Sequence, residues 1–280
     1  MLKGERADMN KLKESGWHFL LIVICLVLLL PVLFMISNSF KTLQDSYHSM
    51  LQIIPAHPTL NNYLTLDKQI SLLRIIWNTF FMATIVTIGK IVTGLLSAYA
   101  FKYFSFKGKK LIYFAFISTI FVPFTVVMIP NFLVISKLNL LNTALGVALP
   151  QLCDATGIML FLKAMDKIPN SLIESVRIDD IPSYKILKDI VVPILRPNII
   201  SIGAIFFINS WNEYVWPTLI LKDKNSFTLP LALQNYISSE GGTNFPLAMA
   251  LSTIMIIVPL LIYLIFQRYI LNSISSSGLK

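Results

Sequence analysis

The sequence predicts an all-α membrane protein with six transmembrane helices. Hydrophobic residues make up 55% of the 280 residues and charged residues only 13%, about half of the roughly 25% that soluble domains carry. Several charge-free runs are longer than the roughly 20 residues that a helix needs to cross the hydrocarbon core. These runs are continuously apolar rather than alternating, which favours helices over the strands of a membrane barrel.

The expected spans divide the chain into segments of very different length. We expect helices across the membrane at residues 17–37, 75–101, 111–136, 142–162, 198–221 and 245–267. A first span preceded by a short segment could be a cleaved signal peptide, but it exceeds the 7 to 15 residues of a typical signal core. The predicted organisation comprises an N-terminal segment (1–16), a first helix (17–37), an outer loop (38–74), a transmembrane domain (75–270) with a polar loop (163–197), and a tail (271–280).

Lysine and arginine concentrate in alternate connections between these spans. With the N-terminus inside, the inner connections hold 16 of the 23 Lys and Arg residues, the outer connections hold 6, and Lys90 lies within the second span. The positive-inside rule then places both termini in the cytoplasm. It also explains the formal net charge of +9 without a nucleic-acid partner, because the cations flank spans.

The polar loop at 163–197 is patterned as two short helices. Ser171 and Glu174 have the spacing of a capping box, which predicts a helix from Ser171 to about Asp179. Pro182 disfavours helix at the preceding residue. A second start at Ser183 leads into apolar residues at helical spacing, and we expect Pro193 and Pro197 to end this helix before the fifth span. The loop should therefore form a helix–turn–helix at the membrane surface.

A motif in this loop resembles the EAA motif of ABC importer permeases. Its residues are Glu174-Ser175-Val176-Arg177-Ile178-Asp179-Asp180, followed by Ile190-Val191-Val192-Pro193. The family pattern is Glu-Ala-Ala, two residues, Asp-Gly, and further along Ile-x-Leu-Pro. Ser175 and Val176 replace the alanines. Asp180 replaces a glycine that is expected in a left-handed turn, a conformation that Asp tolerates better than most residues.

Three further segments are similar to the carbohydrate branch of these permeases, which includes the maltose and glycerol-3-phosphate types. They are Asn78-Thr79-Phe80, Trp211-Asn212-Glu213-Tyr214-Val215-Trp216-Pro217 and Thr228-Leu229-Pro230. The resemblance covers about residues 17–275. It implies a type I ABC importer permease fold with a cytoplasmic coupling helix, in a bacterial inner membrane.

The resemblance also implies partners and a coupling surface. The partners would be a cytoplasmic ATPase dimer, a second permease subunit and an extracytoplasmic solute-binding protein, and the substrate a sugar, sugar alcohol or glycerol phosphate. The helices at 171–191 would dock on the ATPase through Ser171, Glu174, Ser175, Val176, Arg177, Asp179, Asp180 and Pro193. The alternative is that Glu174 only caps its helix and the charges are only solvated. No phosphate-binding Gly-x-x-x-x-Gly-Lys-Ser/Thr loop occurs, so we expect no ATP hydrolysis by this chain and no cofactor.

Polar residues inside the expected spans are candidates for a translocation path, because such residues are costly in lipid and usually face a protein interior or a wet cavity. The candidates are Lys90, Asp154, Asn209, Trp211, Asn212 and Glu213. Lys90 could instead form a structural ion pair with Asp154 or Glu213. Pro217 should kink or interrupt the fifth span, and Trp216 could belong to an aromatic belt at the outer surface.

Two rival interpretations remain open. A self-sufficient, ion-coupled secondary transporter would explain the buried charges, but not the patterned helix pair at 163–197. An intramembrane enzyme is disfavoured because the three histidines, His18, His48 and His57, all precede residue 60 and no nucleophile–base or metal-ligand constellation lies within the spans. Cys25 and Cys153 have no metal or disulfide spacing, so we expect no metal site.

Overall fold

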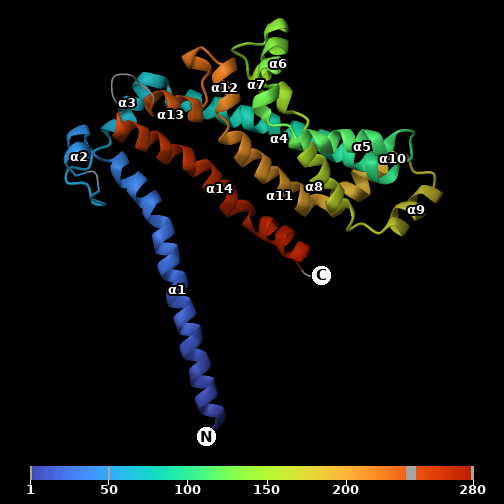
Figure 1. Cartoon of the computed structure of the whole chain (residues 1–280), viewed down its shortest axis with the longest axis horizontal. Coiled ribbons are helices and arrows are strands. Elements are labelled where there is room, and N and C mark those ends of the chain that lie inside the picture. The colour runs from blue at the N-terminus through green and yellow to red at the C-terminus, as the bar shows by residue number, and fades with distance from the viewer. Residues whose placement is uncertain (1, 50, 238–243, 279–280) are drawn as a thin grey trace. The chain divides into compact units, whose positions relative to one another are not determined.

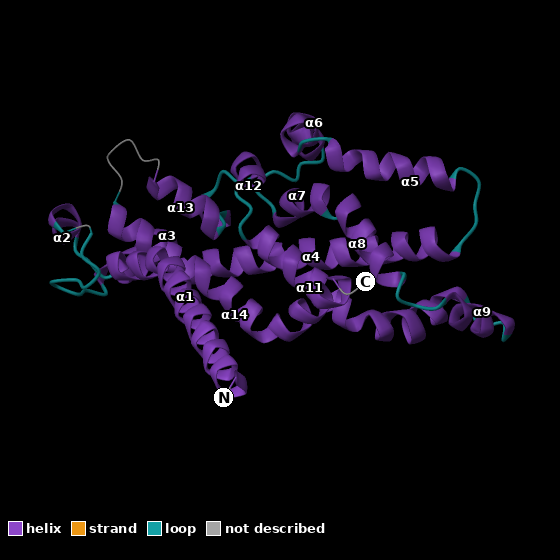
Figure 2. Ribbon diagram, turned by 60° about the horizontal axis from the view of Figure 1, so that its bottom comes forward, coloured by secondary structure: helices purple, strands orange, loops and turns teal. Residues whose placement is uncertain are grey.

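The computed structural model describes residues 2–49, 51–237 and 244–278, and the side chains of residues 16–49, 51–237 and 244–271. Every regular element in these ranges is a helix (Figure 2). The α-helices are α1 (Leu2–Ser39), α2 (Leu43–His48), α3 (Asn61–Ile70), α4 (Leu72–Tyr103), α5 (Lys109–Ser118), α6 (Phe124–Lys137), α7 (Ala144–Ala148), α8 (Ala155–Met165), α9 (Asn170–Ile178), α10 (Ser183–Lys185), α11 (Val192–Trp211), α12 (Val215–Ile220), α13 (Leu229–Ile237) and α14 (Phe245–Gly278). The side chains expected to face the cytoplasm in residues 1–15 and 272–280 lie outside the described ones.

The prediction of an all-α membrane protein is confirmed. Four stretches are long and apolar enough to cross a membrane: Gly16–Ser39, Leu72–Tyr103, Ser183–Trp211 and Phe245–Leu271. Two further pairs of helices pass the same test but are bent, by 104° between α5 and α6 and by 54° between α7 and α8. The count is therefore four spans, or six if each bent pair is one span. The spans expected at 111–136 and 142–162 coincide with these two pairs, and the structure adds a bend within each.

The bends coincide with residues that cannot continue a helix. Pro123 is the N-cap of α6, with an extended ψ of 137°, and proline disfavours helix at the residue before it. The second bend lies at Asp154, the N-cap of α8, whose backbone is also extended. Its side-chain Oδ1 accepts a hydrogen bond from the Thr156 N–H at 2.8 Å, which starts a new helix.

The chain divides into two compact units. One contains the residues up to Gln69 together with Leu233–Ile254, and the other contains Ile70–Ala232 and the residues from Met255 onward. In the second unit, α4, α8 and α11 lie side by side (Figure 1). α4 and α8 approach closely where Gly94 meets Gly157. A Cβ on Gly94 would lie 3.2 Å from the Gly157 carbonyl carbon, so small residues permit this helix packing.

In the first unit, the predicted outer loop at 38–74 contains two helices and a buried lysine. The Lys41 side chain has no exposed surface, and its Nζ donates to the carbonyl oxygens of Ser49 at 2.8 Å and Gln52 at 2.6 Å. Burial lowers the pKa of Lys41 and the nearby Asp45 carboxylate partly offsets this. Asn62 donates to the carbonyl oxygens of Ser39 and Lys41. These bonds fold the segment onto the end of α1.

The prolines expected to end the second surface helix do not end it. Helix continues from Ser183 to Trp211 through both Pro193 and Pro197. A π-helical turn at Ile186–Val191 directly precedes α11, and such widened turns are one way to accommodate a missing backbone N–H within a helix. Pro193 follows this π-helical turn as the second residue of α11. The surface helix and the fifth span therefore form one continuous helix.

Candidate functional site: the α9 surface and a polar cavity

Most side chains of helix α9 are exposed, and one is buried in the core of the second unit. Ile173 is its one buried residue, at 1% exposure, while Ser171, Glu174, Ser175, and Asp179 just beyond the helix, are exposed. Ile173 belongs to a core cluster that joins four segments of the second unit and includes Phe161, Met165, Ile186 and Val191. Val176 is partly buried and packs against the same cluster. The helix therefore has an exposed face that carries polar side chains, and its opposite side is packed into the core.

The predicted capping box of α9 is wrong. The helix begins at Asn170, one residue before Ser171, and its N-cap is Pro169, with no side-chain capping bond. Ser171 thus lies inside the first turn, where its backbone is helical and its hydroxyl is no longer placed to cap. Glu174 is consequently not needed for capping, and its carboxylate lies on the exposed face. This removes the alternative in which Glu174 acts only as part of a capping box.

Arg177 ties α9 to the end of α4. Its guanidinium donates to the Tyr103 carbonyl oxygen at 2.8 Å and lies 5.7 Å from the centre of the Phe104 ring. A charge-assisted hydrogen bond at a helix C-terminus is favourable because the carbonyls there carry partial negative charge. Arg177 was predicted to supply charge for docking, and these contacts give it a positioning role between α9 and α4.

The turn after α9 has the conformation that the sequence predicts. Asp180, which stands where the family has glycine, has a φ of 53°, in the left-handed region that Asp tolerates. Its N–H donates to the Arg177 carbonyl oxygen at 3.2 Å. The exposed side chains beside this turn include two large apolar ones, Ile178 at 82% and Tyr184 at 67% exposure. The α9 surface, defined here as the exposed side chains of residues 171–184, therefore combines carboxylates with apolar groups.

A polar cavity of about 350 Å³ lies between the helices of the second unit. Its lining includes three charged residues, Lys90 from α4, Asp154 at the start of α8 and Glu213 after α11. The Lys90 Nζ lies 3.5 Å from Asp154 Oδ2 and 5.5 Å from the centre of the Phe206 ring. Both side chains of the pair keep some exposure, 16% and 28%. Of the two ion-pair partners considered for Lys90, Asp154 and Glu213, the structure pairs it with Asp154.

Glu213 occupies the break between α11 and α12. Its Oε1 accepts hydrogen bonds from the backbone N–H groups of Val215 at 2.9 Å and Trp216 at 3.2 Å, which caps α12. The fifth span is therefore interrupted between Trp211 and Val215, just before Pro217, rather than kinked at Pro217 itself. Pro217 lies in the first turn of α12, where a missing N–H leaves no bond unmade.

The two tryptophans of this segment are packing residues. Trp211 is fully buried, stacks on Phe207 at 5.9 Å and donates its indole N–H to the Met255 carbonyl oxygen at 3.0 Å. Trp216 is also fully buried and donates to the Val147 carbonyl oxygen at 3.1 Å. Trp211 therefore does not line the cavity, and Trp216 does not belong to an aromatic belt.

Asn209 and Asn212 are exposed and do not line the cavity with Glu213. The Asn212 side chain donates to the Ile208 carbonyl oxygen at 2.8 Å. Sequence reasoning missed two polar residues that do line the cavity, Thr119 and Gln151. Thr119 and Gln151 lie in the short 3-10 turns at the bends of the third and fourth predicted spans, and the nearby prolines, Pro123 and Pro150, are the sequence signal that could have located them.

The fold matches that of chains in solved structures. Its described part is all helical, with interrupted spans and an exposed surface helix, and it matches a bacterial ABC transporter that imports the acidic polysaccharide alginate. That match has a TM-score of 0.80 at 21% identity and covers 93% of this chain and 97% of the other. A second structure of an alginate ABC transporter, in complex with an alginate pentasaccharide-bound periplasmic protein, matches with a TM-score of 0.66 at 16% identity, covering 92% and 94%. The chain therefore shares its fold with a chain of these ABC transporters.

The sequence matches place the chain in a family. Residues 90–276 match the family described as binding-protein-dependent transport system inner membrane component. A relative from Pectobacterium atrosepticum, the sn-glycerol-3-phosphate transport system permease protein UgpE, is 30% identical over 277 residues, which cover 93% of this chain and 95% of the relative. The chain belongs to this family of inner membrane components, and it is a permease subunit of an ABC importer.

Proposed function

We propose that this permease carries a sugar, a sugar alcohol or glycerol phosphate, and that the polar cavity is part of the path. The relative above is named for sn-glycerol-3-phosphate, and the structural neighbour for an acidic polysaccharide. Both compounds combine hydroxyl groups with negative charge. The cavity supplies an ammonium (Lys90), an amide (Gln151), a hydroxyl (Thr119) and carboxylates, which are groups suited to hydrogen bonding with hydroxyls.

We also propose that α9 is the element that couples this chain to a separate ATPase. The observation that carries this proposal is the combination of an exposed face and a rigid attachment. Glu174, Ser175 and Asp179 are exposed, whereas Ile173 is anchored in the core and Arg177 bonds to the end of α4. A push on α9 would therefore move α4 and α11, the helices that its anchors contact. Allosteric coupling requires such a rigid element shared by two states.

The proposal also implies the other subunits of the importer. An ATPase dimer would bind on the cytoplasmic side, because the excess of lysine and arginine supports a cytoplasmic location for α9 and both termini. A second permease subunit would complete the path, because Asn209 and Asn212 of this chain are exposed and would face it. A solute-binding protein outside the membrane would deliver the substrate, as the family description implies.

Co-purification with uptake measurement tests this proposal. The tagged chain, expressed with its genomic neighbours, should bring down an ATPase and a second permease, and uptake should stop when the ATPase is inactivated. Glu174→Lys should abolish uptake and weaken ATPase retention at least about tenfold, since it reverses a charge at the interface. Asp67→Lys, an equal change at an exposed site on α3, should do neither. Ion-driven uptake by this chain alone in liposomes would instead establish a secondary transporter.

A further inference from the structure

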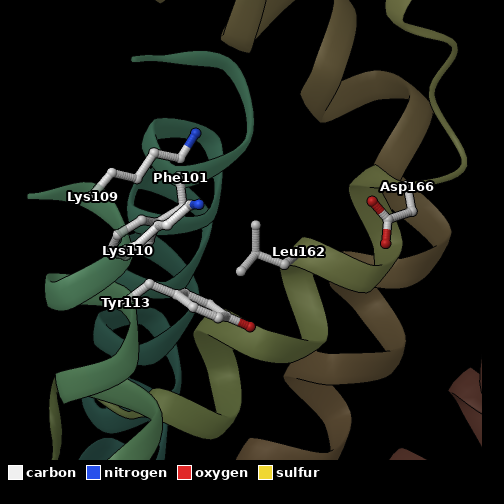
Figure 3. Close-up of a pocket in the computed structure, with 6 residues that line it drawn as sticks. All are labelled: Phe101, Lys109, Lys110, Tyr113, Leu162 and Asp166. Atoms are coloured by element: carbon white, nitrogen blue, oxygen red, sulfur yellow. The ribbon is translucent and has the colours of Figure 1, made fainter. Parts of the chain in front are cut away.

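A second cavity, of about 470 Å³, lies between the start of α5 and the end of α8. Its lining residues are Phe101, Lys109, Lys110, Tyr113, Leu162 and Asp166. Figure 3 shows Lys109, Lys110 and Tyr113 projecting from the α5 side toward Leu162 and Asp166. The volume lies within the roughly 300–1,000 Å³ range of small-molecule sites. This cavity shares no lining residue with the polar cavity around Lys90, so a translocation path through that cavity does not account for it.

The charge around this cavity is positive. Asp166 is its one carboxylate, and the Asp166 Oδ1 is already paired with the Lys102 Nζ at 2.5 Å. The Lys109 Nζ donates to the Phe104 carbonyl oxygen at 2.9 Å. Within the described ranges, the Lys110 ammonium group makes no hydrogen bond or ion pair. Two ammonium groups therefore face a space with no unpaired anion.

The backbone adds to the positive character. Helix α5 begins at Lys109, its N-cap is Gly108, and no side chain caps it. The first N–H groups of a helix carry partial positive charge and bind anions. The 10-residue length of α5 allows this effect, which here coincides with the two lysines and with a cavity.

The other walls of the cavity are apolar. Phe101 and Leu162 line it directly, and the ring of Tyr113 forms part of the wall. The side chains of α5 that follow are also apolar and strongly exposed, Leu111 at 73% and Phe114 at 68%. The site thus has a cationic rim at the end of the spans and an apolar surface leading into the membrane. An amphiphile with a negative headgroup has the complementary arrangement, an anionic end and an apolar tail.

We propose that this cavity binds the phosphate headgroup of an anionic phospholipid. Basic pockets between spanning helices on the cytoplasmic side are sites of this kind. The proposal uses the orientation given under Proposed function but not the substrate or the coupling role of α9. The phosphate would lie against Lys109, Lys110 and the first N–H groups of α5, and an acyl chain would lie along Leu111 and Phe114.

Lipid binding to the intact importer complex tests the proposal. The complex, purified in detergent, would be titrated with phosphatidylglycerol, and bound lipid would be counted by native mass spectrometry. Lys110→Gln should weaken binding roughly fivefold, and the Lys109→Gln/Lys110→Gln double variant roughly 30-fold, given the usual contribution of each lysine near a lipid surface. Lys107→Gln is the matched control, because Lys107 is an exposed neighbour that does not line the cavity, and it should change affinity less than twofold.

Competition distinguishes the source of the phosphate. Phosphatidylcholine should not displace phosphatidylglycerol, and inorganic phosphate should displace it only weakly if the acyl chain contributes. Displacement by inorganic phosphate at equal concentration would show a free-anion site and overturn the lipid assignment. Wild-type affinity in the double variant, or an equal loss in Lys107→Gln, would also overturn it. So would cross-linking of a Tyr113→Cys variant to a partner subunit, because a protein would then fill the cavity.

Discussion

The attachment of α9 through Ile173 gives a quantitative prediction. Ile173 is 1% exposed and packs in the cluster with Phe161, Met165 and Ile186. Truncating a buried isoleucine to alanine costs about 2–4 kcal/mol. Because Ile173 is the one buried side chain of α9, most of this loss should fall on local opening of the helix. Opening in Ile173→Ala should therefore become roughly 30- to 1,000-fold more frequent.

Hydrogen exchange of the assembled importer measures this opening. Peptides covering residues 168–182 should exchange faster by that factor in Ile173→Ala, whereas peptides from the middle of α4 should be unchanged. The ratio of ATP hydrolysed to substrate imported should rise, because a loosened α9 transmits less movement. Leu172→Ala is the control on the same helix, since Leu172 is 39% exposed and its truncation should change exchange less than about fivefold. Unchanged exchange and coupling in Ile173→Ala would refute the reasoning.

Three further variants test other parts of the structure. Gly94→Leu should separate α4 from α8 and lower the melting temperature of the complex, because its Cβ would lie 3.1 Å from the Phe161 ring, whereas Gly16→Leu, with open space around it, should not. Asp154→Asn should keep the α8 cap but leave Lys90 unpaired, which should reduce uptake and lower the melting temperature of the complex. Adding Lys90→Met should restore part of the lost melting temperature, because no unpaired charge then remains. Lys41→Met should remove two charge-assisted hydrogen bonds, to the carbonyl oxygens of Ser49 and Gln52, at a cost of about 1–3 kcal/mol, which limited proteolysis of residues 43–58 would detect as faster cleavage.

The regular parts of the fold could be predicted because they depend on local composition. Charge-free runs located α1, α4 and α14, since their length and apolarity suffice for a span. The bends at Pro123 and Asp154 could not be placed, because a proline alone does not signal a bend: Pro31 and Pro259 lie inside unbroken helices. The continuity of the helix through Pro193 was also missed, because proline was expected to end the helix there. A π-helical turn accommodates that proline, and sequence patterns do not reveal such turns.

The candidate sites could be predicted in part. The motif at 174–180 located α9, and the φ of Asp180 is as expected, because both depend on residues close in sequence. The pairing of Lys90 with Asp154 was one of two alternatives, and only the packing of α4 against α8 decides between Asp154 and Glu213. The inward position of Trp211 could not be inferred, because an indole at a span end fits a core, a belt or a path equally well.

The most direct test of the coupling role is a cross-link from α9 to its partner. Ser175→Cys would be introduced after Cys25 and Cys153 are replaced by serine, and a bifunctional cysteine–lysine reagent added to the assembled importer. We predict a cross-link to the ATPase subunit that changes in yield when nucleotide is bound, and none from Asp67→Cys on α3. An assembled, transport-competent complex in which Ser175→Cys never cross-links to the ATPase would contradict the account.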